Sequence, residues 1–344
     1  MDRRHFLLTA GSASLALAPL GQVAAAPAGR LLVLVDMVGG NDGLNTLVPY
    51  GQAAYYRLRP TIALDRRALL PVADGQGLHP ALRPLMPLWQ DGQLALLQGV
   101  GCADGSLSHH RATEIMDSGR LDDSPLQPGW LARCLAMHEP SRRAATQALV
   151  VTSDLPGPLH GLPRCRSLAC ADGEALTARF GFPADALGDA LARACAELAA
   201  GSDATVIRVA LDGFDTHEDQ PTTHARLLDS LARSLAALRN ALTAMGRWQD
   251  TLVLTRSEFG RLANENLSAG TDHGNASVQL IAGGRVAGGL RGAAADLEAL
   301  DARGGLPATL DFRSLHSALA EQWLGVSAAA LGSDLPVLPF ALTA

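Results

Sequence analysis

The stretch Leu31-Leu32-Val33-Leu34-Val35 is a continuous apolar run that ends in Asp36 and a glycine-rich turn, Gly39-Gly40-Asn41-Asp42-Gly43-Leu44-Asn45. A run without polar alternation predicts a strand buried on both faces, as in a parallel sheet covered by helices. Similar runs, each ending in small or polar residues, occur at 94–97, 148–151, 206–211, 252–254 and 278–282. The chain therefore has the strand pattern of a large buried sheet.

Helical patterns lie between these runs. Apolar residues recur at helical spacing in segments 80–89, 112–118, 130–137, 186–200, 223–248 and 312–324. Strands that alternate with helices predict an α/β fold with a doubly wound, mostly parallel sheet and helices on both faces. In this architecture ligands bind beyond the carboxyl ends of the strands. Segment 156–173, which has Pro, Gly and Cys but no sustained periodicity, is predicted to be a long loop.

The beginning of the chain is typical of an export signal. Arg3-Arg4 precedes a weakly apolar run and then Ala24 and Ala25, which suits twin-arginine export and cleavage after Ala25 or Ala24. Glycine, proline and polar residues interrupt the run, so a stable membrane span is not expected. We predict a signal peptide over 1–25, a single domain over 26–344, and a periplasmic or secreted protein.

Composition limits the partners. The chain has 344 residues, a formal net charge of -6 and no basic run, so nucleic acid is not an expected partner. No oligomeric state is predicted. The five cysteines are an odd number for an exported protein, and Cys165 and Cys170 are close enough in sequence for a structural disulfide.

Carboxylates and imidazoles gather at the predicted strand ends. Asp212, Asp215 and His217 follow one strand, Glu258 follows the next, and the pair Asp272-His273 precedes the last, so these residues are predicted as metal ligands. Zinc and manganese accept this mixture of oxygen and nitrogen donors. Alternatively, Asp215 only forms a turn. Asp272 alternatively orients His273 without binding the metal.

The glycine-rich turn after the first strand lacks the Gly-Lys-Ser/Thr ending of a phosphate loop, so nucleotide binding is not predicted. A carboxylate after such a turn is either a metal ligand or a turn residue. We favour Asp42 over Asp36 as the ligand.

Ser108, His109 and Arg111 are the candidate catalytic residues. They precede or open the predicted helix at 112–118, where a serine hydroxyl commonly caps the helix. Alternatively, Ser108 is a nucleophile, with Arg111 and the helix amides binding an anion. Either His109 or His110 assists, because adjacent side chains point in different directions.

The remaining histidines are assigned surface or packing roles; they are His79, His138, His160, His224 and His316. The glycine-rich segment 283–289 is predicted to be a flexible turn, or alternatively a lid that carries Arg285.

Several motifs together resemble the domain of unknown function 1501 family of exported bacterial proteins. They are the glycine-rich turn continued to Tyr50, Tyr55-Tyr56-Arg57-Leu58-Arg59-Pro60, Gly77-Leu78-His79-Pro80, Ser108-His109, Gly213-Phe214-Asp215-Thr216-His217, Ser257-Glu258-Phe259-Gly260-Arg261 and Gly270-Thr271-Asp272-His273-Gly274. That family in turn resembles the alkaline phosphatase and sulfatase superfamily. The resemblance implies that Asp215 (or Asp212), His217 and His273 hold one metal ion. It also implies a second ion at Asp42 and Glu258, and Ser108 as the nucleophile.

Two departures from the superfamily pattern qualify this inference. Glu258-Phe259 stands where the superfamily often has Asp-His, which weakens or removes the second metal site. No cysteine lies in the pattern that sulfatases convert to formylglycine, which disfavours a conventional sulfatase. We predict an exported, metal-dependent hydrolase-like protein that uses zinc, manganese or calcium and acts on small-molecule or polymer esters of phosphate or a related acid. The alternative is a non-catalytic envelope protein that binds a partner through a degenerate hydrolase fold.

Overall fold

The computed structural model of the protein describes residues 29–122, 128–152, 157–168, 178–332 and 336–344. The predicted signal peptide and Cys170 lie outside these described residues. Within the described ranges, none of the helices is both long enough and apolar enough to cross a membrane.

A nine-stranded sheet is the centre of the fold. Its main strands, in spatial order, are β13 (Gly289–Arg291), β5 (Leu94–Gly101), β12 (Ser277–Gly283), β9 (Thr251–Arg256), β1 (Leu31–Val38), β8 (Val206–Asp212), β6 (Ala148–Val151) and β7 (Cys165–Ser167), while β14 (Leu310–Asp311) pairs with β5. Every strand predicted from an apolar run is present. The prediction that segment 156–173 is a long loop is wrong, because its described part contains β7, which pairs with β6 at the edge of the sheet.

Strand direction explains which residues meet at the functional edge. β1 is parallel to both β8 and β9, whereas β12 is antiparallel to β9 and to β5. β5 therefore runs in the same direction as β1. The beginning of the antiparallel β12 lies at the edge where the parallel strands end, so residues before β12 can join residues that follow the other strands.

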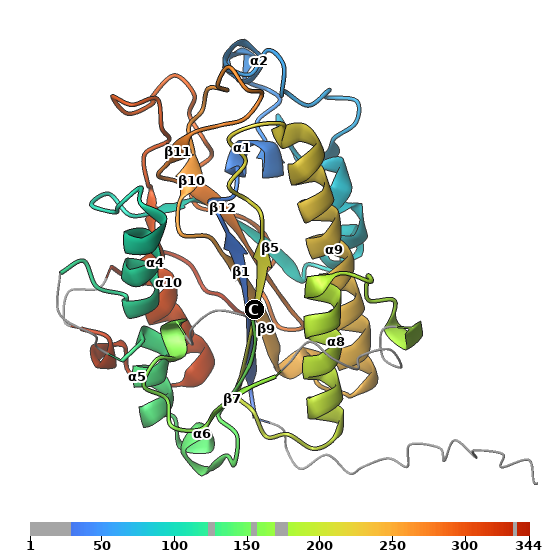
Figure 1. Ribbon diagram of the computed structural model, residues 1–344, viewed down its shortest axis with the longest axis vertical. Coiled ribbons are helices and arrows are strands. Elements are labelled where there is room, and N and C mark those ends of the chain that lie inside the picture. The colour runs from blue at the N-terminus through green and yellow to red at the C-terminus, as the bar shows by residue number, and fades with distance from the viewer. Residues whose placement is uncertain (1–28, 123–127, 153–156, 169–177, 333–335) are drawn as a thin grey trace, which may run out of the picture.

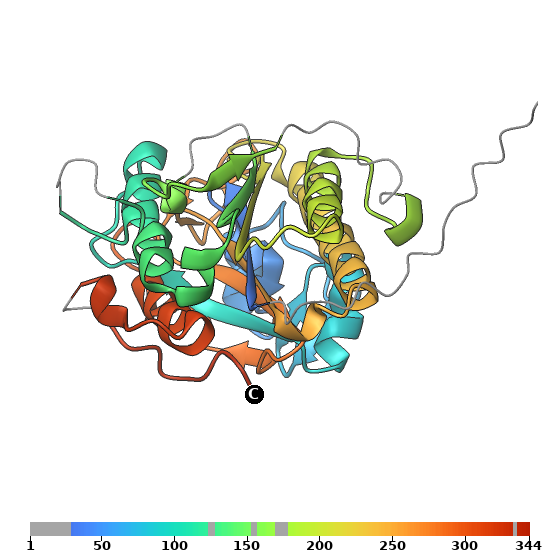
Figure 2. The same ribbon diagram turned by 90° about the horizontal axis from the view of Figure 1, so that it is seen from below.

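Helices cover both faces of the sheet, as predicted (Figures 1 and 2). One face carries η1 (Pro80–Leu85), α3 (Met86–Gln90), α8 (Ala186–Ala199) and α9 (Gln220–Ala244). The other carries α4 (His109–Ser118), α5 (Trp130–Met137), α6 (Glu139–Arg143), α10 (Phe312–Ala318) and η4 (Leu319–Leu324).

The two cores follow from the alternation of side chains along β1. Leu31, Val33 and Val35 pack into the core under α8 and α9, and Leu32 and Leu34 pack into the core under α5 and α10. All five side chains are fully buried. Each such burial contributes roughly 1.5–3 kcal/mol, so the uninterrupted apolar run is needed on both faces.

Smaller elements extend beyond the carboxyl edge of the sheet (Figure 1). They are α1 (Gly43–Thr46), α2 (Ala53–Leu58), the three-stranded sheet of β2 (Leu47–Val48), β3 (Leu70–Ala73) and β4 (Gln76–Leu78), and the ribbon of β10 (Gly260–Arg261) and β11 (His273–Gly274). Three further short 3₁₀ helices are η2 (Gly157–Leu159), η3 (Trp248–Asp250) and η5 (Ala328–Ala330). Within the segment 283–289, Gly284 and Arg285 form a turn between β12 and β13, and Arg285 pairs with Asp250 at 2.8 Å.

Candidate metal centre

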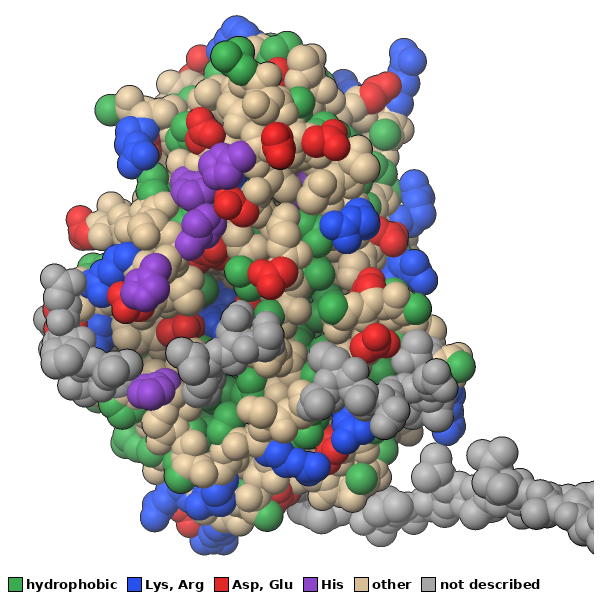
Figure 3. Space-filling model, in the orientation of Figure 1, with side chains coloured by type: hydrophobic (Ala, Val, Ile, Leu, Met, Phe, Trp, Pro, Cys, Tyr) green, Lys and Arg blue, Asp and Glu red, His purple; other side chains and the backbone are tan. Residues whose placement is uncertain are grey.

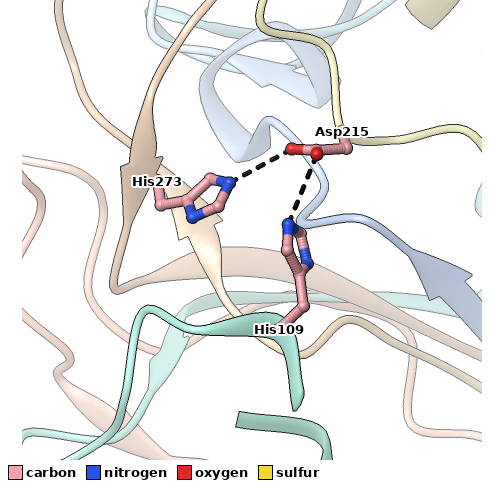
Figure 4. A group of neighbouring side chains, drawn as sticks. All are labelled: His109, Asp215 and His273. Carbon is pink, nitrogen blue, oxygen red and sulfur yellow. Dashed lines mark hydrogen bonds and ion pairs between the residues drawn. The ribbon is translucent and has the colours of Figure 1, made fainter. Parts of the chain in front are cut away.

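Three histidines and one aspartate meet beyond the carboxyl edge of the sheet. His109 is the first residue of α4, Asp215 and His217 follow β8, and His273 lies in β11. Figure 4 shows His109 and His273 turned toward the two carboxylate oxygens of Asp215. Histidine side chains also gather beside carboxylates on the molecular surface in this region (Figure 3).

Two glycines let the loop after β1 pass close to this cluster. Gly39 and Gly40 have φ angles of 117° and 86°, which side chains rarely tolerate. A Cβ atom on Gly39 would lie 2.3 Å from the backbone nitrogen of Asp215, and one on Gly40 would lie 2.5 Å from the Phe259 ring. Both positions therefore require glycine, because a side chain would clash with the neighbouring Asp215 or Phe259 and because the backbone has a positive φ angle.

Arg261 joins the loops around the cluster. Its side chain is almost completely buried, and its guanidinium donates hydrogen bonds to the carbonyl oxygens of Gly39, Gly40, Phe214 and Thr271. The same group reaches Oδ1 of Asp215 at 2.7 Å. One cation thus joins the loops after β1 and β8 to the loop that precedes β11.

The hydrogen bonds of the imidazoles determine which ring nitrogen carries the proton. Nδ1 of His273 lies 2.9 Å from the carbonyl oxygen of Leu107, which can only accept, so Nδ1 is the donor. Nδ1 of His217 faces Oδ1 of Asp272 at 3.1 Å, and Nδ1 of His109 faces Oε1 of Glu258 at 2.9 Å. In a neutral ring the Nε2 atom is then left with a lone pair.

The three Nε2 atoms converge on Asp215. Nε2 of His217 and of His273 each lie 3.1 Å from Oδ1, and Nε2 of His109 lies 3.3 Å from Oδ2. The two former nitrogens are 2.9 Å apart. Burial opposes ionisation of Asp215, but the hydrogen bond and the positive charge of Arg261 outweigh burial and hold its pKa below the ordinary value. An anionic carboxylate and three nitrogen lone pairs at this spacing repel one another unless a cation lies between them.

The donor set fits a divalent metal ion. His109, Asp215 and His273 offer ligand atoms that all lie within 4.8 Å of one another. Nε2 of His109 is buried without a hydrogen-bond partner among the described residues. Ligand atoms around a tetrahedral zinc lie about 3.3 Å apart, and each imidazole of such a site usually donates its other N–H to a carboxylate or carbonyl. Four pairs of donor atoms lie 2.9–3.3 Å apart, close to the first condition, and the three engaged Nδ1 atoms meet the second.

Asp42 lies apart from this cluster, in contrast to its sequence-based assignment. Its oxygens are bound by Arg59 at 2.5 and 3.1 Å and by Nε2 of Gln220 at 2.5 Å, and they also cap α1 through the amides of Leu44 and Asn45. Burial alone would raise its pKa, but Arg59 outweighs burial and lowers it. The carboxylate is satisfied without a metal, so we leave Asp42 out of the candidate site.

Glu258 and Asp272 hold imidazoles rather than facing the cluster directly. Glu258 accepts a hydrogen bond from the Gly39 amide at 2.8 Å as well as from His109, which positions its carboxylate behind that ring. Asp272 contacts His217, whereas the sequence suggested that it orients His273. His109, predicted as a catalytic group, lies among the metal donors.

The other predicted catalytic residues, Ser108 and Arg111, lie beside His109 at the beginning of α4. Ser108 is exposed and precedes α4, but its hydroxyl does not cap the helix, so the simple capping interpretation is wrong. Arg111 lines the cavity beside α4 and pairs with Glu114 at 3.3 Å. Asp212 also lines this cavity at the end of β8, outside the group of converging donors.

Two of the remaining histidines have the packing role that was one of the alternatives predicted for them. His79 and His224 are buried behind the glycine-rich loop, with ring centroids 6.0 Å apart. His224 lies 3.0 Å from Oδ1 of Asn41, and His79 accepts a hydrogen bond from the Ala81 amide. Burial lowers the pKa of each imidazole to about 4. The packing role predicted for His316 is present, since its ring stacks on a tryptophan.

A cavity of about 1090 Å³ opens beside the cluster. His109, Asp215 and Glu258 contribute to one end of its lining. Arg208 and Arg256, which are buried at the end of the sheet, line another part. The candidate centre therefore has an adjoining space large enough for an organic ligand.

These features define an α/β protein with a histidine- and aspartate-rich centre at the carboxyl edge of its sheet. Residues 175–316 match the model of a family described as "Protein of unknown function (DUF1501)", which confirms the predicted resemblance over that segment. No curated protein matches the chain by sequence.

Several solved structures are similar to the chain. A phosphonate monoester hydrolase from Silicibacter pomeroyi is 11% identical with a TM-score of 0.43, and the match covers 86% of this chain and 73% of that one. The lipoteichoic acid synthase LtaP from Listeria monocytogenes is 10% identical with a TM-score of 0.42, covering 90% and 74%. A protein in the alkaline phosphatase superfamily from Vibrio parahaemolyticus is 10% identical with a TM-score of 0.42, covering 87% and 67%.

Proposed function

We propose that the protein is a metal-dependent hydrolase of phosphate or related esters and that it binds one divalent ion through His109, Asp215, His217 and His273. The observation that carries the proposal is the convergence of three Nε2 lone pairs on one carboxylate, each on a ring whose Nδ1 is already engaged. A bound ion would act as a Lewis acid that neutralises charge on the ester oxygens.

The second ion predicted from the motif resemblance is not part of the proposal. Asp42 is neutralised by Arg59, and Glu258 accepts hydrogen bonds from His109 and Gly39. Both oxygens of Asp42 are engaged and Oε1 of Glu258 already accepts two hydrogen bonds, so the two carboxylates do not together supply a second site. The proposal is therefore a single-ion centre.

Ser108 is kept as the proposed nucleophile. It adjoins His109 at the beginning of α4, and its hydroxyl is not used as a helix cap. In the covalent step Oγ would form a bond to phosphorus while the bond from phosphorus to the ester oxygen breaks. The departing alcohol takes the serine proton, and water then hydrolyses the serine ester. Ser108→Ala with intact metal content should abolish turnover of an aryl phosphate; unchanged turnover would exclude this covalent step.

Metal analysis of protein purified without chelators tests the centre itself. We expect about one zinc, manganese or calcium ion per chain, because the single cluster supplies four donors. His217→Ala and His273→Ala should lose the ion. His110→Ala is the matched control, because its side chain is 84% exposed and pairs with Glu114. Absence of metal together with no rescue on adding these ions would contradict the proposal.

Turnover separates the enzyme from the alternative of a non-catalytic binding protein. The metal-loaded protein should hydrolyse aryl phosphate, phosphodiester or sulfate esters, and the two histidine variants should not. Stoichiometric metal without turnover of any of these esters would favour the non-catalytic alternative.

We also propose export to the periplasm or beyond by the twin-arginine route. The support is the Arg3-Arg4 signal pattern at the beginning of the chain. Replacing both arginines by lysine should retain the protein in the cytoplasm with residues 1–25 uncleaved, as measured by fractionation and mass spectrometry. Normal export of that variant would refute the route.

A further inference from the structure

The cavity beside the metal centre is larger than the reacting group of an ester requires. Pockets of roughly 300–1,000 Å³ enclose whole drug-sized ligands, and this cavity of about 1090 Å³ extends from the metal centre to the buried end of the sheet. Its space can thus hold the alcohol half of a substrate whose ester group lies at Asp215.

Four charged side chains form the deep part of the cavity lining. Asp36 pairs with both Arg208 and Arg256, and Arg256 also pairs with Asp117 of α4 at 2.7 Å. Asp36, Arg208 and Arg256 are each at most 4% exposed, and the Asp117 side chain is 16% exposed. We call these four residues the charged quartet.

The charged quartet adds little to the stability of the fold. Buried ion pairs cost several kcal/mol of desolvation per ion and roughly break even against apolar packing. Burial raises the pKa of the Asp117 carboxyl even beside Arg256. The Gly157 backbone lies close against this wall, because a Cβ on Gly157 would lie 2.8 Å from Oδ2 of Asp117. A recognition role accounts for these polar groups on a cavity wall.

The chemistry of the lining selects the ligand. Guanidinium groups only donate hydrogen bonds and carboxylates only accept them, so alternating charges suit hydroxyl groups, which do both. Among the described lining residues carboxylates outnumber guanidinium groups, which disfavours a ligand with further negative charge. The described lining contains no phenylalanine, tyrosine or tryptophan for stacking an aromatic alcohol.

We propose that the cavity binds the alcohol half of the substrate and that this alcohol is uncharged and polyhydroxylated, the chemistry shared by sugars and glycerol headgroups. This inference rests on the proposed hydrolase function for its turnover test. The charged quartet is the part of the wall that recognises the hydroxyl groups, with Asp117 as the acceptor most open to the cavity.

Matched substrates test the alcohol class in the metal-loaded protein. Glycerol 3-phosphate and propyl phosphate differ by two hydroxyl groups, and fructose 6-phosphate and fructose 1,6-bisphosphate differ by one phosphate. We expect kcat/KM to be at least tenfold higher for the first member of each pair. The ratio of glycerol 3-phosphate to glucose 6-phosphate then distinguishes a glycerol headgroup from a sugar. Equal values within both pairs would overturn the inference.

Asp117→Asn tests the charged quartet. It should lower the preference for glycerol 3-phosphate over propyl phosphate at least tenfold, with melting temperature and metal content as checks on folding. Asp250→Asn, which removes a carboxylate from an exposed ion pair, is the control and should keep the preference. If Asp117→Asn does not fold, Asp117→Glu, which keeps the charge and moves the carboxylate, is measured instead. A preference that survives the change at Asp117 would refute the role of the quartet.

A binding experiment separates this inference from the proposed function. Metal-free protein is titrated with glucose and with glycerol by calorimetry, where millimolar binding that weakens at least tenfold in the Asp117 variant is expected. If no ester is hydrolysed but a polyol still binds in this way, the hydrolase proposal fails and the polyol site stands. If neither polyol binds, the polyol site is refuted whatever the turnover.

Discussion

Lowering the pH from 7 to 5 should destabilise the fold through the buried pair His79 and His224. Each imidazole has a pKa of about 4 in the folded protein, below its ordinary value of 6.5, chiefly because burial disfavours the charged ring. Asp42 opposes the shift of both rings, while Arg59 and Arg261 add to that of His224. The unfolded chain therefore binds protons that the folded one does not.

The sign and size of the effect follow from linkage. The folded pKa lies below the unfolded one, so the free energy of unfolding that depends on these rings is at its full value above about pH 6.5. It decreases as the pH is lowered and stops decreasing below about pH 4. At pH 5 each histidine lowers the free energy of unfolding by about 2 kcal/mol, so the pair lowers it by about 4 kcal/mol. A domain is typically stable by about 5–15 kcal/mol, so the loss is measurable.

Urea unfolding of metal-free protein at several pH values between 7 and 5 measures this loss, with tryptophan fluorescence as the probe. His224→Gln removes one titrating ring, so its stability should fall by about 2 kcal/mol less than that of the unchanged protein over the same range. His110→Gln is the matched control for a histidine-to-glutamine change, because that side chain is 84% exposed. An equal loss in His224→Gln and the unchanged protein would refute the reasoning.

Three further substitutions test the contacts that hold the candidate metal centre and the neighbouring glycine-rich loop in place. Asp272→Asn replaces the carboxylate behind His217, and we expect about a 10–100-fold weaker metal affinity in a chelator competition, against no change if the contact is incidental. Gly39→Ala places a Cβ 2.3 Å from the Asp215 nitrogen, so both metal affinity and melting temperature should fall, whereas an unchanged melting temperature would contradict the close packing. Arg59→Met leaves a buried carboxylate unpaired, which should cost about 3–5 kcal/mol in urea unfolding; a cost below 1 kcal/mol would refute the pairing.

Much of the fold could be predicted from the sequence because buried parallel strands have a direct signature. The run at 31–35 is apolar at every position, and the structure buries its side chains in two cores. Strand direction has no such signature, since an apolar run reads alike in both directions. The antiparallel course of β12 was therefore not anticipated, although it is what brings His273 to the edge where the other strands end.

The candidate centre was partly predictable for a related reason. Asp215, His217 and His273 follow or precede strands, so their positions follow from topology. The role of Asp42 could not be assigned in the same way, because its cationic partner lies 17 residues away and meets it only in the folded protein. A useful signal was present, however, because a carboxylate in an apolar setting needs a cation and Arg59 lies in the adjoining motif.

The central position of β1 has a consequence for the synthesis of the chain. β1 is formed from the first described residues, but both its neighbours, β8 and β9, begin only at Val206 and Thr251. At about 5–20 residues per second, the ribosome takes roughly 10–40 s to reach the first of these partners. Throughout that time an apolar segment with unpaired edges must be kept from associating with other chains. The growing polypeptide should therefore depend on chaperones until more than half of it has emerged.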